Sequence, residues 1–489
     1  MKRRPMSKKR LFLPLLILFI LMSLLPILLL GSQTIQQLII KATGTNANLI
    51  IDASVTLGKI NPVWNSYAQG GEASVDMLAP VLAAVTALHP RYIRIDHIYD
   101  HFNVVSRDTN GTLKFNFSEL DAIVTTITKT GAIPFVSLSY MPSVIAEGGD
   151  ITGKPTNWNE WSLVVRQTIE HISGKTQLNI ADVYYEVWNE PDLFGNWKYY
   201  GDKNYLTLYE YSVNGATAAT NTQSFKIGGP AITKLYKNWI TALANYVTQK
   251  NLRLDFFSWH LYTKNPQEYA KDISNVTSWL FPYPSLVTLP RLITEWGFDS
   301  DINSGYDNML SAAHAIATVR NTLAGYEHLF AFELVDGLDP AGKQYWGRWG
   351  LITHPSQGQV TKPRYSAFML LNQIGGLRLL VKGEGTWVTG IATSGENGNV
   401  QLLVVNYDPT NSHVESVPIQ FKGLKVGNYS LKKQSLRTQI MNSPAQTIQV
   451  TEATFSTQLI MPANTLTLLQ LVPVSASSSA NATPSGLTP

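Results

Sequence analysis

Between about Ile60 and Pro363 the chain alternates short apolar runs with longer segments whose apolar residues recur at a helical period. The apolar runs have the length of buried strands, and they lie near Val63 to Ser66, Tyr92 to Ile95, Ile133 to Leu138, Tyr184 to Trp188, Lys226 to Gly229, Phe256 to His260, Leu292 to Glu295 and Leu329 to Leu334. Eight strands with helices between them, over about 300 residues, predict a (β/α)8 TIM barrel. A doubly wound open sheet is the alternative, but no G-x-G-x-x-G follows the first strand.

Residues at the ends of the predicted helices support this alternation. Pro80 stands at the start of one helix, and Asn157 with Glu160 three residues later resembles a capping box. Gly131 and Gly174 suit the C-terminal ends of two others. The helical segments therefore have starts and stops of their own.

Beyond Leu379 the period of the apolar residues changes to two. The segments TWVTGIA, VQLLVVNY, VPIQF, TIQV and TLTLLQLV are separated by Gly, Asn and Pro, which predicts a C-terminal antiparallel β-sandwich. Asn48 to Val55 also has the pattern of a strand, and we expect it to pair with this sandwich. The predicted domains are an N-terminal strand segment at 47–59, the barrel at 60–365, the sandwich at 366–473 and a disordered tail at 474–489, which is rich in Ser, Ala, Thr and Pro.

The N-terminal segment from Leu11 to Gly31 is apolar and carries no charge. Its length is about the 20 residues that a membrane-spanning helix requires. Six basic residues precede it, namely Lys2, Arg3, Arg4, Lys8, Lys9 and Arg10, and the first charge beyond it is Lys41. This pattern predicts a cytoplasmic segment at 1–10, a transmembrane anchor at 11–31, a linker at 32–46 and a single-pass protein whose folded domains lie outside the cell membrane.

A cleaved signal peptide, which would release a secreted protein, is the alternative for this segment. The apolar region of a signal peptide usually runs about 7 to 15 residues and ends at a small-residue site. Leu30 and Ser32 match such a site poorly. The sequence therefore favours the anchor.

Charge and cysteine content narrow the classes of function. The chain has 38 basic and 34 acidic residues, but without the N-terminal cluster the basic residues number 32, so no basic patch is implied and nucleic acid is not an expected partner. The chain has no cysteine, which excludes disulfides, thiolate zinc sites and a cysteine nucleophile. A serine nucleophile has no support either, because no G-x-S-x-G elbow is present.

Metal ligation by His97 and His101 is a further possibility, since the two residues are four apart. That spacing brings side chains together on a helix, whereas these residues follow a strand, and the glutamate of H-E-x-x-H is missing. We expect neither a metal nor another cofactor.

Two glutamates stand at the ends of predicted buried strands: Glu190 in YYEVWNEPD closes the fourth, and Glu295 in PRLITEWG closes the seventh. The C-terminal ends of barrel strands converge on one face, so the two carboxyl groups should share a site. Hydrolysis of a glycosidic bond with retention uses two carboxyl groups about 5 to 5.5 Å apart. We expect Trp188 and Trp296 to give a sugar a flat apolar platform and to form a poorly hydrated wall. Solvated loop carboxylates without a catalytic role are the alternative.

Several segments resemble a known family. WNEPDL and TEWG resemble the acid/base and nucleophile motifs of glycoside hydrolase family 39, in the GH-A clan of retaining (β/α)8 glycosidases. YIRID, PFVSLSYMPSVIA and FFSWHLY resemble, in order, segments of the β-xylosidases of that family. The likeness covers about Ile60 to Tyr365, and the family's β-sandwich would account for the rest. The resemblance implies that Glu190 is the general acid/base and Glu295 the nucleophile.

The resemblance also assigns substrate-binding residues. It implies that Asn189 hydrogen-bonds the 2-hydroxyl of the sugar and that Arg94 lies near the nucleophile. His260 and Tyr262 would contact the sugar and orient the nucleophile. A structural ion pair for Arg94 and a buried His260 bonded only to backbone are the alternatives.

The chain departs from the family pattern at positions that bear on the sugar. Asp96 stands where the family usually has histidine, with His97 one residue later, and Asp192 matches the α-L-iduronidases better than the xylosidases. Strand eight, LFAFELVDG, lacks the tryptophan expected of the xylosidases. These departures leave the sugar open.

Three functions are therefore considered. The leading one is a retaining, β-xylosidase-like glycosidase that acts, as an exo or endo enzyme, on an oligosaccharide or polysaccharide such as a plant oligosaccharide or a bacterial exopolysaccharide. The second is an α-L-iduronidase-like activity on uronic acids, which would need cationic residues beside the site. The third is a non-catalytic carbohydrate-binding protein on the same fold, which should have lost a catalytic carboxylate.

Overall fold

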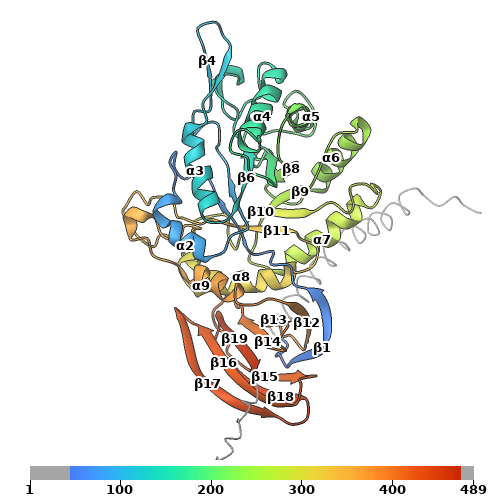
Figure 1. The fold of residues 1–489 in the computed structure, drawn as a ribbon, viewed down its shortest axis with the longest axis vertical. Helices are drawn as coiled ribbons and strands as arrows, with labels where there is room; N and C mark the ends of the chain where they lie inside the picture. The colour runs from blue at the N-terminus through green and yellow to red at the C-terminus, as the bar shows by residue number, and fades with distance from the viewer. Residues whose placement is uncertain (1–43, 475–489) are drawn as a thin grey trace, which may run out of the picture.

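The computed structural model describes residues 44–474 (Figure 1). The predicted cytoplasmic segment at 1–10 and the predicted anchor at 11–31 lie outside the described residues, as do most of the linker and the tail from 475 onward. Across 44–474, no helix combines the length and the apolar character that a membrane crossing needs.

Eight parallel strands close into a barrel in the order β10-β11-β2-β3-β6-β7-β8-β9. Their bounds are β2 (Ser66–Gln69), β3 (Tyr92–Ile95), β6 (Ile133–Leu138), β7 (Val183–Val187), β8 (Phe225–Ile232), β9 (Phe257–Tyr262), β10 (Arg291–Gly297) and β11 (His328–Phe332). The predicted strands match these closely, except that the first starts at Ser66 instead of Val63. Val63 and Trp64 form a buried turn ahead of β2, and a buried turn carries the same apolar pattern as a buried strand.

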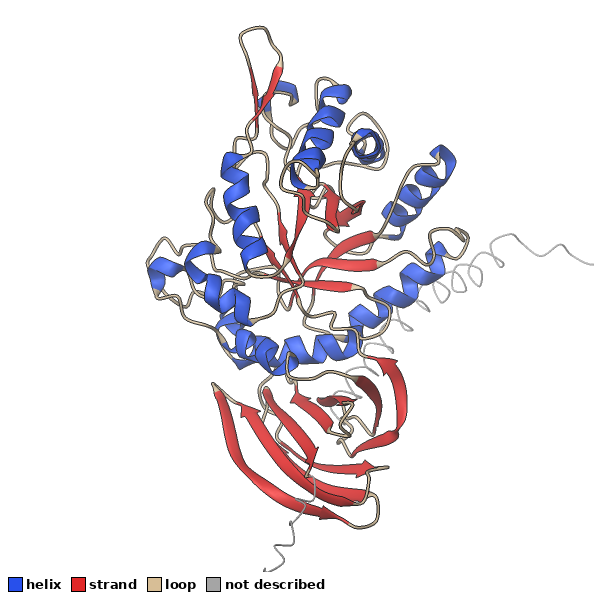
Figure 2. Ribbon diagram, viewed as in Figure 1, coloured by secondary structure: helices blue, strands red, loops and turns tan. Residues whose placement is uncertain are grey.

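Helices surround the barrel (Figure 2). They are α2 (Leu82–Ala87), α3 (Ser118–Lys129), α4 (Trp158–Ile172), α5 (Tyr205–Ala218), α6 (Lys237–Lys250), α7 (Gln267–Leu280), α8 (Met309–Thr322) and α9 (Pro363–Leu371), with short 3-10 turns η1 (Ala79–Val81), η2 (Glu147–Gly149), η3 (Ser304–Asp307) and η4 (Pro355–Gln357). Most of the longer helices bury one face: α4 buries Trp161, Val164 and Val165, which share a face at helical spacing. The exception is α8, which is buried on all sides from Ser311 to Val319.

The helix ends differ in part from the sequence prediction. Asn157 does cap α4, because its side chain accepts a hydrogen bond from the backbone N–H of Asn159. The capping box is wrong, since the carboxylate of Glu160 pairs with Arg107 instead. Arg107 belongs to a small hairpin of β4 (Val105–Arg107) and β5 (Leu113–Phe115), which the sequence analysis did not predict.

The remaining strands form a nine-stranded sheet in the order β17-β16-β19-β14-β13-β12-β1-β15-β18. They are β1 (Leu49–Lys59), β12 (Leu377–Lys382), β13 (Val388–Ser394), β14 (Val400–Asn406), β15 (Glu415–Lys422), β16 (Gly427–Leu436), β17 (Ile440–Val450), β18 (Thr454–Met461) and β19 (Thr465–Pro473). This sheet lies beside α8 (Figure 1).

The sheet is continuous and folds over on itself, because strands from both of its halves contribute to one apolar core. The strand predicted at Asn48 to Val55 holds the two halves together: β1 pairs antiparallel with β12 and parallel with β15. The prediction of a purely antiparallel sandwich is therefore wrong at this strand. A period of two indicates a strand but not the direction of its neighbours.

The central position of β1 makes its inward side chains important for stability. Ile51 is 0% exposed, whereas Leu57 on the same strand is 45% exposed. We expect Ile51→Ala to lower the free energy of unfolding by about 2 to 5 kcal/mol, because it removes buried methyl groups and leaves a cavity. The matched control Leu57→Ala should change it by less than about 0.5 kcal/mol. Urea denaturation of both variants checks this, and equal effects would contradict the placement of β1.

Candidate active site

A cavity of about 680 Å³ opens where the C-terminal ends of the barrel strands meet. It is lined by Gly70, Gly71, Glu72, Asp96, His97, Tyr140, Asn189, Glu190, Leu193, Phe194, Thr233, Lys234, Leu261, Tyr262, Glu295, Ser300, Asp301, Phe332, Arg348 and Trp349. A smaller cavity of about 230 Å³ has residues of α8, β12 and β13 in its walls but no carboxylate. The larger cavity is the candidate site because both strand-end glutamates face it.

The two glutamates meet at one histidine. The Nδ1 atom of His260 lies 2.8 Å from Oε1 of Glu190 and 3.6 Å from Oε2 of Glu295. One carboxylate oxygen from each glutamate and a ring nitrogen of His260 all lie within 4.8 Å of one another. This spacing agrees with the separation of about 5 to 5.5 Å that retention requires.

Arg94 on β3 holds three of the surrounding side chains. Its guanidinium is fully buried and donates from Nε to Glu186 at 2.8 Å, from Nη1 to Glu295 at 2.9 Å and from Nη2 to the side-chain oxygen of Asn189 at 2.7 Å. The amide nitrogen of Asn189 donates in turn to the hydroxyl of Tyr140 at 3.0 Å. An amide nitrogen has two N–H groups, so Asn189 keeps one donor for a ligand in the cavity.

Burial and charge set the protonation of the central groups. Burial raises the pKa of Glu295, although His260 and Arg94 oppose that rise. Burial acts to lower the pKa of His260, but the negative charges of Glu295 and Glu190 outweigh it, and the pKa is raised. The hydroxyl of Tyr262 donates to Oε2 of Glu295 at 2.9 Å, and burial keeps the pKa of Tyr262 well above its usual range. Tyr262 is therefore a hydrogen-bond donor at neutral pH.

The backbone after β7 turns sharply to present Glu190. Trp188 has a φ of 73° and Glu190 a φ of 45°, both in the left-handed region that residues other than glycine rarely adopt. Two hydrogen bonds hold this turn: Ser137 donates to the carbonyl of Trp188 at 2.9 Å, and the N–H of Glu190 donates to the carbonyl of Ala231 at 2.9 Å. Left-handed residues held by their surroundings are frequent at active sites.

The expectation that Trp188 and Trp296 offer their faces to a sugar is wrong. Both indoles are 0% exposed and lie outside the lining of the cavity. Successive side chains of a strand point to opposite faces, so Trp296 points away from the cavity that Glu295 enters, and the guanidinium of Arg364 lies 4.8 Å from its ring. Trp188 packs edge-on against Tyr140 and donates to the carbonyl of Phe194.

Other residues take part that the sequence analysis did not single out. Trp349 lines the cavity, with the guanidinium of Arg348 3.8 Å from its ring centre, and Arg348 pairs with Glu72. Phe332 packs edge-on against Trp349. The segment YWGRWG, in the long loop after strand eight, contains the one available signal, because Trp and Gly in a loop beyond a barrel strand suit a sugar site.

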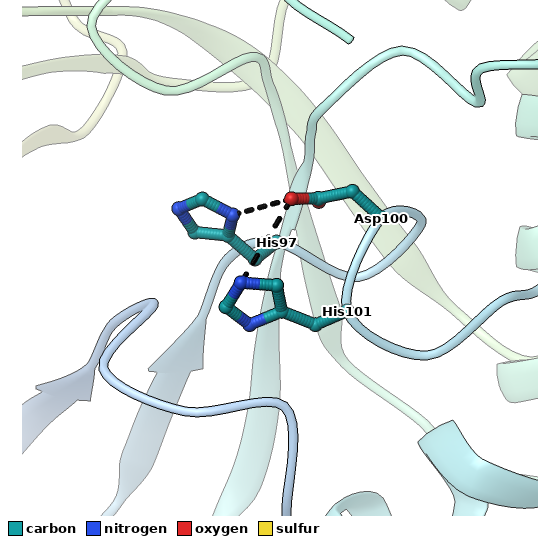
Figure 3. Close-up of side chains that lie close together, drawn as sticks. All are labelled: His97, Asp100 and His101. Carbon is teal, nitrogen blue, oxygen red and sulfur yellow. Dashed lines mark hydrogen bonds and ion pairs between the residues drawn. The ribbon is translucent and has the colours of Figure 1, made fainter.

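His97 and His101 lie at the edge of the site with Asp100 (Figure 3). We expected His97 and His101 to lie apart because they follow a strand, and this expectation is wrong. One helical turn, in which the N–H of His101 donates to the carbonyl of His97, stacks the rings with centroids 4.3 Å apart. Nδ1 of His97 lies 2.7 Å from Asp100, which is a hydrogen-bond distance. Nε2 of His101 lies 3.9 Å from the same oxygen of Asp100, so the two ring nitrogens converge on one carboxylate oxygen. One atom from each of the three residues lies within 4.8 Å of the others, a spacing that a metal ion could also use.

A parallel eight-stranded barrel with two close carboxylates at its C-terminal face is an arrangement that glycoside hydrolases use. The sequence from 47 to 428 matches the family described as "Glycosyl hydrolases family 39". The chain belongs to this family, and it is a glycosidase that hydrolyses O-glycosyl compounds.

Similar proteins include two β-xylosidases. The chain is 25% identical over 415 residues to the β-xylosidase of Caldicellulosiruptor saccharolyticus, which covers 77% of this chain and 81% of that protein. It is also 25% identical over 335 residues to the β-xylosidase of Geobacillus stearothermophilus, covering 61% and 64%.

Solved structures share the fold. A monomeric β-xylosidase from Caulobacter crescentus CB15 superposes with a TM-score of 0.75 at 19% identity, over 88% of this chain and 100% of that one. A bacterial orthologue of human α-L-iduronidase gives a TM-score of 0.68 at 16% identity, over 88% and 84%. At these identities the likeness establishes the architecture alone.

Proposed function

We propose that this protein is a retaining glycoside hydrolase with β-xylosidase-like specificity for neutral sugars. The observation that supports it best is the approach of Glu190 and Glu295: one carboxylate oxygen of Glu190 lies within 4.8 Å of one carboxylate oxygen of Glu295. Inverting enzymes separate their carboxyl groups by about 6.5 to 9.5 Å to leave room for a water molecule between them and the sugar. The shorter distance suits direct attack by one carboxylate.

The contacts of the two carboxylates support a division of roles. Both oxygens of Glu295 accept hydrogen bonds, one from Arg94 and one from Tyr262, and these bonds favour the ionised form that a nucleophile needs. Among the described side chains, Glu190 forms a hydrogen bond with His260 alone, through Oε1, so its second oxygen remains free to exchange a proton with the substrate. Glu190 suits the general acid/base role and Glu295 the nucleophile role.

Double displacement follows from these positions. In the first step Glu190 gives its proton to the glycosidic oxygen while Glu295 attacks the anomeric carbon, so the carbon–oxygen bond to the leaving group breaks and a glycosyl ester forms. In the second step Glu190 takes a proton from water, whose oxygen displaces Glu295 from the anomeric carbon. Each step inverts the carbon, and the product keeps the original configuration.

The charges in the cavity favour a neutral sugar over a uronic acid. Five carboxylates line it, on Glu72, Asp96, Glu190, Glu295 and Asp301. Of the two cations in the lining, Arg348 is already paired with Glu72, and Lys234 belongs to the loop after β8. A uronate would meet surplus negative charge, whereas hydroxyl groups can donate to these oxygens. The names of the two β-xylosidase relatives agree with this choice.

The first test compares substrates. We expect an aryl β-xyloside to be cleaved with a kcat/KM at least about a hundredfold higher than an aryl α-L-iduronide, because juxtaposed like charges cost several kcal/mol. Chromogenic assays at low and high ionic strength measure both rates. Preference for the iduronide would overturn the neutral-sugar assignment.

The second test separates the two glutamates. Glu295→Ala should abolish turnover of every substrate, because covalent catalysis is lost. Glu190→Ala should still form the glycosyl-enzyme from substrates with good leaving groups, and azide should then release a glycosyl azide of unchanged anomeric configuration. Azide rescue of Glu295→Ala should instead give the inverted product. NMR of the products reads the configuration, and the reverse pattern would exchange the two roles.

The third test uses pH. Tyr262→Phe removes a hydrogen bond to the ionised Glu295, so the pKa of Glu295 should rise further and the acid limb of the kcat/KM profile should move to higher pH. A hydrogen bond to a charged group contributes about 1.5 to 3 kcal/mol, which corresponds to a shift of about one to two pH units. Tyr67→Phe is the matched control, since this buried tyrosine packs on Phe368 instead of a carboxylate. If the acid limb of the profile is unchanged in Tyr262→Phe, Glu295 is not the group whose ionisation controls activity.

A further inference from the structure

The order of strands gives the cavity two distinct sides. In the ring of eight strands, β7 and β8 lie opposite β11 and β2. The segments after β2 and β11 supply Glu72 and Trp349, and those after β7 and β8 supply Phe194 and Lys234. A general acid must lie beside the oxygen that it protonates. The leaving group therefore extends from Glu190 over the segments after β7 and β8.

Large apolar side chains are exposed on these same two segments. Leu193 is 56% exposed, Phe194 41%, Tyr200 59% and Tyr236 40%. Leu193 and Phe194 also line the cavity, so these two side chains extend the apolar surface up to the proposed site of bond cleavage. Apolar side chains gathered on a protein surface mark binding sites, and an aromatic ring can stack on the apolar face of a sugar.

The two segments are fixed to each other, so these side chains stand on an ordered scaffold. Asp192 accepts hydrogen bonds from the backbone N–H of Thr233 at 3.0 Å and from its hydroxyl. Asn238 donates to the hydroxyl of Tyr199 at 3.1 Å. Tyr199 packs between Tyr200 and Trp239, with ring centroids 5.0 and 5.7 Å away.

We propose that Leu193, Phe194, Tyr200 and Tyr236 form a platform that binds the sugar residues on the leaving-group side of the cleaved bond. The occupant is an extended oligosaccharide or polysaccharide chain, whose sugar rings stack on the aromatic side chains while Lys234 donates to hydroxyl groups. This inference rests on the proposed function, because the roles of the two glutamates define which side the leaving group takes. The natural substrate is accordingly a longer chain and not a short glycoside.

The test compares substrate lengths in the whole protein. The probes are an aryl β-xyloside and β-xylo-oligosaccharides of increasing length. We expect kcat/KM of the unmodified protein to rise with length. In Tyr200→Ala/Tyr236→Ala, the ratio of kcat/KM for the longest oligosaccharide to that for the aryl xyloside should fall by about tenfold, since two aromatic stacking contacts are lost.

Phe281→Ala provides the matched control. Phe281 is 80% exposed at the C-terminal end of α7, on the face of the barrel away from the cavity, and its removal should leave the ratio unchanged. Binding of the oligosaccharides to Glu295→Ala, with and without the two tyrosine changes, gives a second measurement free of turnover.

The outcomes separate the two proposals. Suppose that the aryl xyloside is cleaved, that kcat/KM does not rise with oligosaccharide length and that the ratio is unchanged in Tyr200→Ala/Tyr236→Ala. This result would overturn the platform and leave the proposed function intact. Failure to cleave the aryl xyloside and all the oligosaccharides overturns the proposed function and the platform together. A loss of the same size in Phe281→Ala would show that the effect does not come from the platform.

Discussion

The site depends on one buried cation. Arg94 lies in the barrel interior at 0% exposure, where an uncompensated charge would cost several kcal/mol. Its planar guanidinium compensates that charge by donating hydrogen bonds to Glu186, Glu295 and Asn189, which come from two other strands and a loop. The carboxylate of Asp96 adds a fourth contact at 3.7 Å. The acids thus outnumber the arginine. The pKa of His260 is raised in spite of burial because Glu295 and Glu190 lie beside it, and the positive charge of Arg94 only opposes that rise.

A second buried cation fixes the wall of the cavity. Lys362 is 0% exposed and lies 2.7 Å from Asp307, 2.7 Å from Asp336 and 2.9 Å from the carbonyl of Arg348. It therefore connects the segment after β10 with the long loop after β11, which carries Trp349. Arg94 orders the groups proposed for catalysis, while Lys362 orders the loop that carries Trp349 in the wall of the cavity.

The sequence predicted the barrel well because burial of a parallel strand on both faces leaves a nearly continuous apolar run, and the strand ends fix where polar side chains emerge. Glu190 and Glu295 were found for that reason. Trp296 was misplaced because neighbouring residues of a strand point to opposite faces. Trp188 was misplaced because it lies in the left-handed turn after β7, where its indole packs against Tyr140 instead of facing the cavity. Glu72 and Arg348 could not be paired beforehand, since they are far apart in the chain and no periodicity links their loops. The parallel pairing of β1 with β15 was missed because a strand pattern carries no information about its partner.

These differences separate chemistry from specificity. The buried groups around Arg94 follow from strand ends and short motifs, and the family match over 47–428 spans them. The loops around the cavity follow no such pattern, and they supply Phe194, Lys234 and Trp349. Relatives at 25% identity therefore say more about the type of glycosidic bond that is cleaved than about the saccharide that contains this bond. Four of the five carboxylates that line the cavity, on Glu72, Asp96, Glu295 and Asp301, come from β10 and from the segments after β2, β3 and β10, whereas the exposed apolar side chains follow β7 and β8. The two ends of a bound substrate would therefore meet different chemistry, as the proposed neutral sugar linked to an extended chain requires.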